Sequence, residues 1–153
     1  MVTLYEFYLW VHITCAVIWV GADFTIQVFA FRLLRENDPA RIAGFAKDVE
    51  WMGLRAITPS SILLVIFGFL LVHQGHWSYD FWLIFGIAVW ALSAIVGAGF
   101  LGPESGRIGK LIDEHGPDHP EAQARIRRIL AFSRVELVLL LAVIFDMTVK
   151  PFL

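Results

Sequence analysis

A histidine and an aspartate stand inside the first apolar segment of this chain, YLWVHITCAVIWVGADFTIQVFAF (residues 8–31). A helix turns by 100° per residue, so His12, Trp19 and Asp23 lie within about 20° of one stripe, which we expect to face other helices. At 1.5 Å per residue, Asp23 lies about 16 Å from His12 along the helix, too far for the two groups to touch. The segment therefore predicts two separate sites.

His12 could bind a metal ion or haem iron, because neutral imidazole is a good ligand in apolar surroundings. The second apolar segment ends in LLVHQGHW and the fourth in FDMTVKPF, which places further donors at the same end of the bundle. His12 and His73 together would hold a six-coordinate b-type haem. A copper site is the alternative, and its ligands would be His12, His73, His76 and Met147. A purely structural histidine, donating to a backbone carbonyl, stays open for His12.

Asp23 lies nearer the other end of the bundle. Three charged residues are expected at a similar depth, because the second and fourth apolar segments begin at that end: Arg55, Arg134 and Glu136. An ionisable side chain inside a bilayer costs at least a few kcal/mol. This favours a buried ion pair between Asp23 and one of the arginines, which would hold helices together. A proton path or a site for an anionic substrate is the alternative.

The composition indicates the elements that carry these residues. The chain has 153 residues, 58% of them hydrophobic and 17% charged, with a mean hydropathy of +0.70. A soluble domain is about half apolar and a quarter charged. A membrane span needs roughly 20 apolar residues, and four segments predict transmembrane helices: residues 4–31, 55–74, 80–101 and 129–150. We therefore expect an all-α, polytopic four-helix bundle, a single integral membrane domain over residues 1–153.

The distribution of charge predicts the orientation. Eleven of the twelve basic residues lie in the two longer connections or beside them. The positive-inside rule then places both connections in the cytoplasm and both termini outside. No basic region precedes the first apolar segment, so it is expected to stay as a transmembrane helix. The sequence predicts a multi-pass protein of the bacterial inner membrane, with the lipid bilayer and no nucleic acid among its partners.

The two cytoplasmic connections are predicted to contain amphipathic helices. In NDPARIAGFAKDVEWMG, Asp38 is a candidate N-cap and Pro39 takes the first helical position, so a helix lies on the membrane surface or extends the second span. In PDHPEAQARIRRILAF, Asp118 and Glu121 suggest a capping box, and the fourth helix would begin there. The intervening GPESGRIGKLIDEHGP is Gly-rich and predicted to be irregular, with at most one short helix.

Small residues four apart mark the third span. Ser93 and Gly97 form one such pair, and Ala94 and Ala98 form another. Small residues at this spacing let helices approach closely in lipid. An internal helix contact is the favoured interpretation, and a homo-oligomer formed through the third span is the alternative.

The stretch HITCAVIWVGADF resembles a motif of small bacterial four-helix membrane proteins, in which a tryptophan stands seven residues after a histidine and a glycine closely follows. That group includes CopD-like copper-resistance proteins, HemJ-type protoporphyrinogen oxidases and an uncharacterised family of predicted integral membrane proteins. The chain is most similar to the uncharacterised family, at His12, Trp19, Gly21, RAITPS (55–60) and MTVKP (147–151).

The resemblance to HemJ-type oxidases would imply a haem b and oxidation of a porphyrinogen, with His12 as a candidate ligand and Arg32 as the arginine that ends the first span. The resemblance to CopD-like proteins would imply copper handling at the outer side. The leading hypothesis is therefore a haem b-binding redox protein with a membrane redox partner. The alternatives are a copper-binding or copper-transport protein and a non-catalytic accessory subunit. The sequence leaves open whether the protein is an enzyme, and it indicates no substrate.

Overall fold

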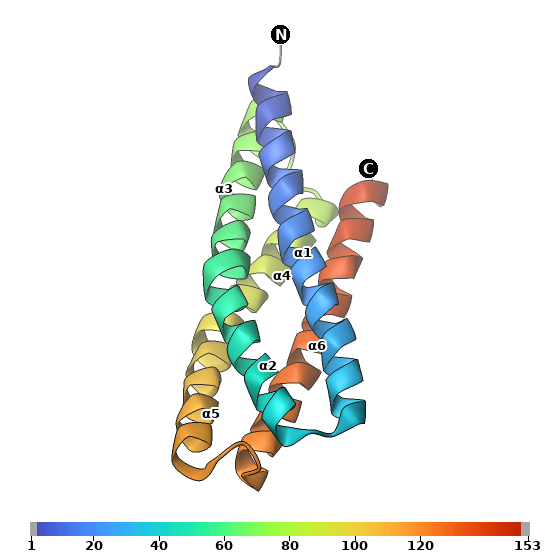
Figure 1. Ribbon diagram of the computed structural model, residues 1–153. Coiled ribbons are helices and arrows are strands. Elements are labelled where there is room, and N and C mark those ends of the chain that lie inside the picture. Colours follow the sequence, from blue (N-terminus) through green and yellow to red (C-terminus); the bar gives the residue numbers. More distant parts are fainter. Residues whose placement is uncertain (1–2, 151–153) are drawn as a thin grey trace.

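The computed structural model describes residues 3–150, which are helical throughout apart from short connections and contain no strand. Both chain ends, and Pro151 of the terminal motif, lie outside the described residues. Figure 1 shows the elements in chain order: α1 (Leu4–Glu36), α2 (Pro39–Met52), η1 (Gly53–Ile57), α3 (Thr58–Gly75), α4 (Phe81–Val96), η2 (Gly97–Leu101), α5 (Gly102–His115) and α6 (Pro120–Val149). The elements η1 and η2 are π-helical turns inside two continuous helices.

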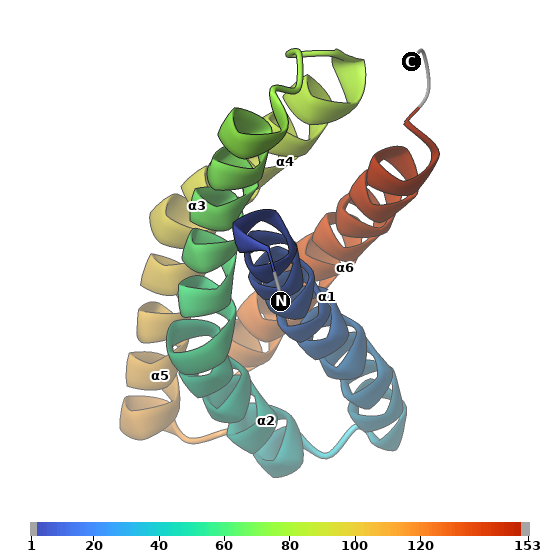
Figure 2. The same cartoon turned by 90° about the horizontal axis from the view of Figure 1, so that it is seen from above.

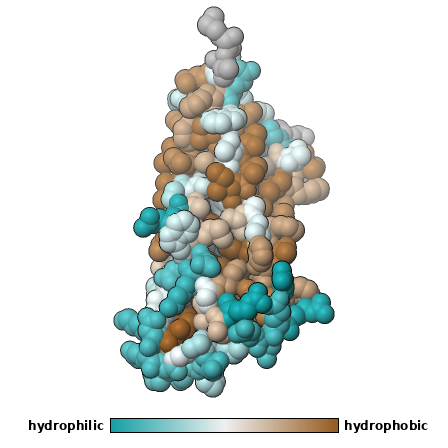
Figure 3. Space-filling model, viewed as in Figure 1, coloured by the Kyte–Doolittle hydropathy of each residue, from teal (hydrophilic) through white to brown (hydrophobic). Residues whose placement is uncertain are grey.

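Three of these helices are long and apolar enough to cross a membrane: Leu4–Glu36, Pro39–Gly75 and Phe81–His115. On the face shown in Figure 3, apolar surface covers most of the upper part, and polar residues gather at the end formed by α2, α5 and the start of α6, which we call the charged end. We call the opposite end, where α1 begins and α6 ends, the aromatic end. The fourth helix, α6, carries Arg134, Glu136 and Asp146 in its apolar half and does not meet the same criterion. The all-helical membrane class is confirmed, with three of the four predicted spans.

Each π-helical turn lies just before a proline. Pro59 follows η1 and Pro103 follows η2 by two residues. A proline inside a helix has no N–H to donate, and its ring collides with the carbonyl four residues earlier. A widened turn relieves this clash, so both helices continue through their prolines. The Thr58 hydroxyl also donates to the carbonyl of Gly53 at 2.8 Å, across η1.

These continuous helices revise the predictions for the connections. The first connection extends the second helix, and the carboxylate of Asp38 caps α2 by accepting from the backbone N–H groups of Ala40 and Arg41 at 3.0 and 3.3 Å. The second was predicted to be irregular, which is wrong. It forms the 14-residue helix α5, because Ile108 is buried in the core and outweighs the low helix propensity of the glycines.

The predicted capping box at the start of α6 is also not formed. His119 is the residue before the helix, and no side chain caps it. The carboxylate of Glu121 instead accepts two hydrogen bonds from Arg125, one turn further on, at 2.8 and 3.0 Å.

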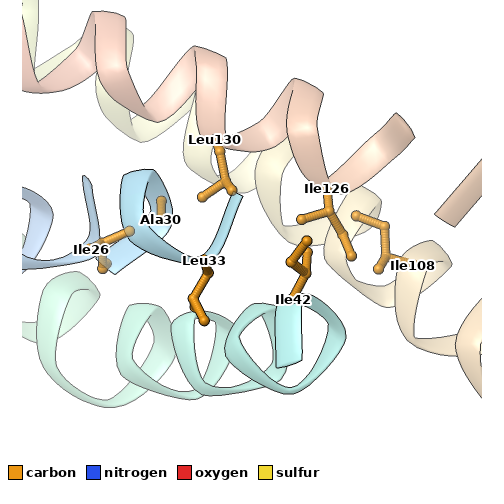
Figure 4. Close-up of a cluster of buried hydrophobic side chains, with 7 residues drawn as sticks. All are labelled: Ile26, Ala30, Leu33, Ile42, Ile108, Ile126 and Leu130. Atoms are coloured by element: carbon orange, nitrogen blue, oxygen red, sulfur yellow. The ribbon is translucent and has the colours of Figure 1, made fainter. Parts of the chain in front are cut away.

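An apolar cluster joins four helices at the charged end. Figure 4 shows its buried members: Ile26, Ala30 and Leu33 of α1, Ile42 of α2, Ile108 of α5, and Ile126 and Leu130 of α6. Since the cluster includes Ile42 of α2 and Ile108 of α5, it holds both helices to the bundle. The charged end is therefore a compact four-helix core.

The helices are less tightly joined toward the aromatic end. There α1 packs along α3 and α4 packs along α6, while α3 and α4 touch little. Figure 2, seen from above, shows α1 between α3 and α6. The Trp90 indole N–H of α4 donates to the carbonyl of Ser61 of α3 at 3.0 Å and links the two pairs. This separation leaves a cleft between them.

Candidate functional site

The cleft has a volume of about 590 Å³ and is lined by α1, α3, α4 and α6. Most of its wall is aliphatic or aromatic. Trp19, Val89 and Leu140, each 5% exposed, form a buried cluster at the side of the cleft nearest the charged end, and we call these three residues its floor. The volume lies in the usual range for small-molecule and cofactor sites, about 300–1,000 Å³.

His12 of α1 lines the cleft, and its ring is held by α3. The Nδ1 atom lies 2.8 Å from the carbonyl oxygen of Leu64. A carbonyl can only accept, so Nδ1 carries the proton and donates it. The lone pair of neutral His12 is therefore on Nε2. Histidines that bind metals are usually oriented in this way, by a hydrogen bond from the other ring nitrogen.

Met147 of α6 lines the same cleft from the other helix pair. Each of these two side chains lies over a glycine of its neighbouring helix. A Cβ atom at Gly68 of α3 would meet the His12 ring, with Cε1 at 3.1 Å, and one at Gly86 of α4 would collide with the Met147 methyl group. The glycines therefore provide the space that an imidazole and a thioether occupy on two walls of the cleft.

The other predicted donors lie elsewhere. His73 and His76 are exposed, at the end of α3 and just after it, and neither lines the cleft. Gly68 lies beside the His12 ring, and His73 follows it by five residues, about 7.5 Å further along the helix. Within residues 3–150, no group of three or more His, Cys, Asp or Glu side chains could hold a metal ion. The structure thus places His12 and Met147 on the walls of one cleft, but not the predicted pair of histidines.

The buried charges differ from the prediction. Asp23 is buried and Glu136 half-buried, while Arg55 and Arg134 are exposed. Neither arginine forms an ion pair with Asp23 in the part of the chain described, so the expected buried ion pair is not formed. Arg134 Nε instead donates to the side-chain oxygen of Gln27, one turn from Asp23, at 3.4 Å.

A buried ion network does form, at the charged end. Glu104 of α5, with 4% of its side chain exposed, accepts from Arg125 of α6 at 2.6 Å and from Arg107 at 3.2 Å. Burial alone would raise the pKa of Glu104, but the hydrogen bonds and charges of the two arginines outweigh it and hold this pKa below its usual value. The network ties α5 to α6 and is structural in character.

Gly68, Gly86 and Trp90 were not identified from the sequence as site residues. An isolated glycine inside an apolar helical segment often marks close packing, and this signal was present for both glycines. Their partners were not predictable, because helices far apart in sequence bring them together.

The two small-residue pairs of the third span lie in different surroundings. Ser93 is buried against α6, whereas Ala94 and Ala98 lie on the outer face.

An apolar helical bundle with three helices long and apolar enough to cross a membrane is the architecture of an integral membrane protein. The family model described as "Predicted integral membrane protein (DUF2269)" matches residues 6–151, and the chain belongs to this family. The uncharacterised family suggested by the motifs is thereby confirmed. The comparisons do not show the relation to HemJ-type oxidases or CopD-like proteins. No curated protein and no solved structure matches the chain.

Proposed function

We propose that the cleft binds a b-type haem, with Nε2 of His12 as an axial ligand and Met147 as the candidate second ligand. The observation that carries this proposal is that an imidazole and a thioether line one apolar cleft, each over a glycine of the neighbouring helix. Histidine and methionine are an established pair of haem ligands, and they raise the reduction potential of the iron. Such a haem would make the protein a membrane redox protein, as the resemblance to HemJ-type oxidases also suggests.

The size and polarity of the cleft favour haem over a bare metal ion. A macrocycle would fill apolar space of about 590 Å³, which a single copper ion would leave empty. The same donor pair supports copper as the second candidate, since imidazole and thioether both suit Cu(I). His73 and His76 would have to move to complete a copper site, because both are exposed outside the cleft.

The orientation and the fourth span belong to the same proposal. We infer that α6 also crosses the bilayer, because it packs on α1 and α4 and exposes a long apolar face that includes Val135, Val138 and Phe145. Every basic residue except Lys150 lies at the charged end or in the helix segments that lead to it, which supports a cytoplasmic position for this end in the bacterial inner membrane. The cleft and both termini would then lie in the extracytoplasmic half.

The test is the absorption spectrum of the detergent-purified protein after expression with ample haem. A Soret band is expected for the wild type. His12→Ala should lose it, and Met147→Leu, which nearly conserves volume, should keep the haem with altered axial ligation. His73→Ala is the matched control, because it removes an exposed imidazole outside the cleft.

Three outcomes would change the proposal. If the wild type has no Soret band, haem is the wrong cofactor, and metal analysis then decides between copper and a non-catalytic accessory role. If His73→Ala abolishes the band as His12→Ala does, the ligands are the two histidines predicted from the sequence. If His12→Ala keeps the native spectrum while folded, His12 is only a structural residue bonded to Leu64.

A further inference from the structure

The bundle changes from apolar to polar one helical turn below the floor of the cleft. Each floor residue has a polar residue four positions further toward the charged end, and side chains at this spacing lie on the same helix face. These residues form one layer and come from three helices: Asp23 of α1, Ser93 of α4 and Glu136 of α6. The apolar cluster of the charged end follows below this layer.

The two carboxylates of the layer lie near each other. Asp23 and Glu136 interact electrostatically across the contact between α1 and α6. Asp23 is only 5% exposed, and its Oδ2 atom has no hydrogen-bond partner among the described residues. The Ser93 hydroxyl lies close to the Glu136 carboxylate. The side-chain nitrogen of Gln27, one turn further along α1, is buried and also without a partner. Buried polar atoms usually have a hydrogen-bond partner, so these unpaired atoms mark the layer as a candidate position for a proton or an ion.

Within residues 3–150, no positive side chain forms an ion pair with Asp23 or Glu136. Arg134 of α6 is exposed and bonded to Gln27, and Arg55 of η1 is exposed. Glu50 of α2 lines a separate pocket beside α5. The only titratable group of α3 is His73, at the aromatic end, and α4 places Ser93 at this depth. The pair therefore has no counter-charge from any helix packed around it.

Two ionised carboxylates cannot share a site of low dielectric without a cation, because burial and mutual repulsion both oppose the second charge. We propose that Asp23 and Glu136 share one proton and form a proton-binding site in the membrane interior. Uptake of the proton converts one carboxylate into a carboxylic acid, whose O–H donates to the remaining carboxylate. The charge of the pair changes from −2 to −1, and the Ser93 hydroxyl stabilises the charge that remains. This site does not depend on what the cleft binds.

Infrared spectroscopy of the purified full chain in sodium-free buffer at neutral pH tests the proposal. The wild type should show the C=O stretching band of a protonated carboxylic acid, shifted in D2O. Asp23→Asn and Glu136→Gln should each lose this band, because each leaves a single carboxylate without an acidic partner. Asp48→Asn is the matched control and should keep it, since Asp48 is exposed. Asp146→Asn should keep it as well, which separates the pair from the other buried aspartate.

Absence of the band in the wild type would overturn the proposal. If the wild type is then stabilised by adding sodium or potassium ions, the occupant is a monovalent cation instead of a proton. A band that persists in both Asp23→Asn and Glu136→Gln would place the acid elsewhere and would also overturn it. If a variant does not fold, the wild type labelled with ¹³C-aspartate is measured in its place. The C=O band should then shift in part, and an unshifted band would exclude Asp23.

Discussion

Replacing Gly68 by alanine should leave the stability of the protein almost unchanged and weaken binding at His12. A Cβ atom at this position would lie 3.1 Å from Cε1 and 3.3 Å from Nδ1 of the His12 ring. Both distances are shorter than ordinary contacts, so the ring must move by a few tenths of an ångström. That movement disturbs its hydrogen bond of 2.8 Å to Leu64.

Two effects of opposite sign act on the free energy of unfolding. Loss of the hydrogen bond between His12 and Leu64 costs about 1 kcal/mol. Replacing a glycine inside a helix by alanine stabilises by about 1 kcal/mol. The net change for Gly68→Ala should therefore lie near zero. Gly44→Ala, in α2, is the control, because a Cβ atom there meets nothing within 4 Å. This variant should therefore show only the stabilisation by the higher helix propensity of alanine.

Binding should respond differently from stability. Removing the partner that orients a metal-bound histidine lowers metal affinity by about 10–100-fold, and we expect a loss of this size in a haem titration of Gly68→Ala. Chemical unfolding followed by circular dichroism gives the stability. ¹⁵N NMR of labelled histidine reports the Nδ1–H bond directly, whatever the ligand is. The reasoning is refuted if Gly68→Ala gains as much stability as Gly44→Ala and keeps the Nδ1–H bond intact.

Three further predictions concern the contacts that hold the helices together. Glu104→Gln should destabilise the protein by about 2 kcal/mol, because it removes the charge-assisted hydrogen bond from Arg125, whereas Glu121→Gln should cost less than about 1 kcal/mol at its exposed site. The pKa of Glu104 is lower in the folded chain than in the unfolded one, so its contribution to stability is complete above the unfolded pKa and is lost as the pH falls through the folded pKa. Trp90→Phe should cost about 1 kcal/mol and loosen α3 from α4, because the carbonyl of Ser61 loses its indole donor.

The measurements for these predictions are unfolding curves at neutral and acidic pH. If Glu104→Gln and Glu121→Gln lower the free energy of unfolding by the same amount, burial of the ion network adds nothing to stability. At acidic pH, the difference in unfolding free energy between the wild type and Glu104→Gln should become smaller. A difference that does not change with pH would contradict the lowered pKa of Glu104. Trp10→Phe is the control for Trp90→Phe, since Trp10 is 64% exposed on α1. A similar cost for both would mean that the bond to Ser61 contributes no stability.

The class of the protein follows from its amino-acid sequence alone. A long apolar segment inside a bilayer has no water to bind its backbone, and a helix pairs every backbone N–H and C=O group within the segment itself. Composition alone reveals such segments. The sequence also located His12 and Asp23 on one stripe, because helical geometry is local. The same local rules predicted the cap at Asp38 correctly.

Which side chains meet depends on how the helices pack, and the sequence did not predict this. The sequence paired Asp23 with an arginine, whereas the packing of α1 on α6 places it against Glu136 and leaves Arg134 exposed. It paired His12 with His73, whereas the structure places Met147 on the same cleft. It treated residues 102–115 as irregular, although burial of Ile108 holds them in a helix. Partners on different helices depend on how each helix is rotated and how deeply it lies in the bundle, and both are set by packing against neighbours far away in the sequence.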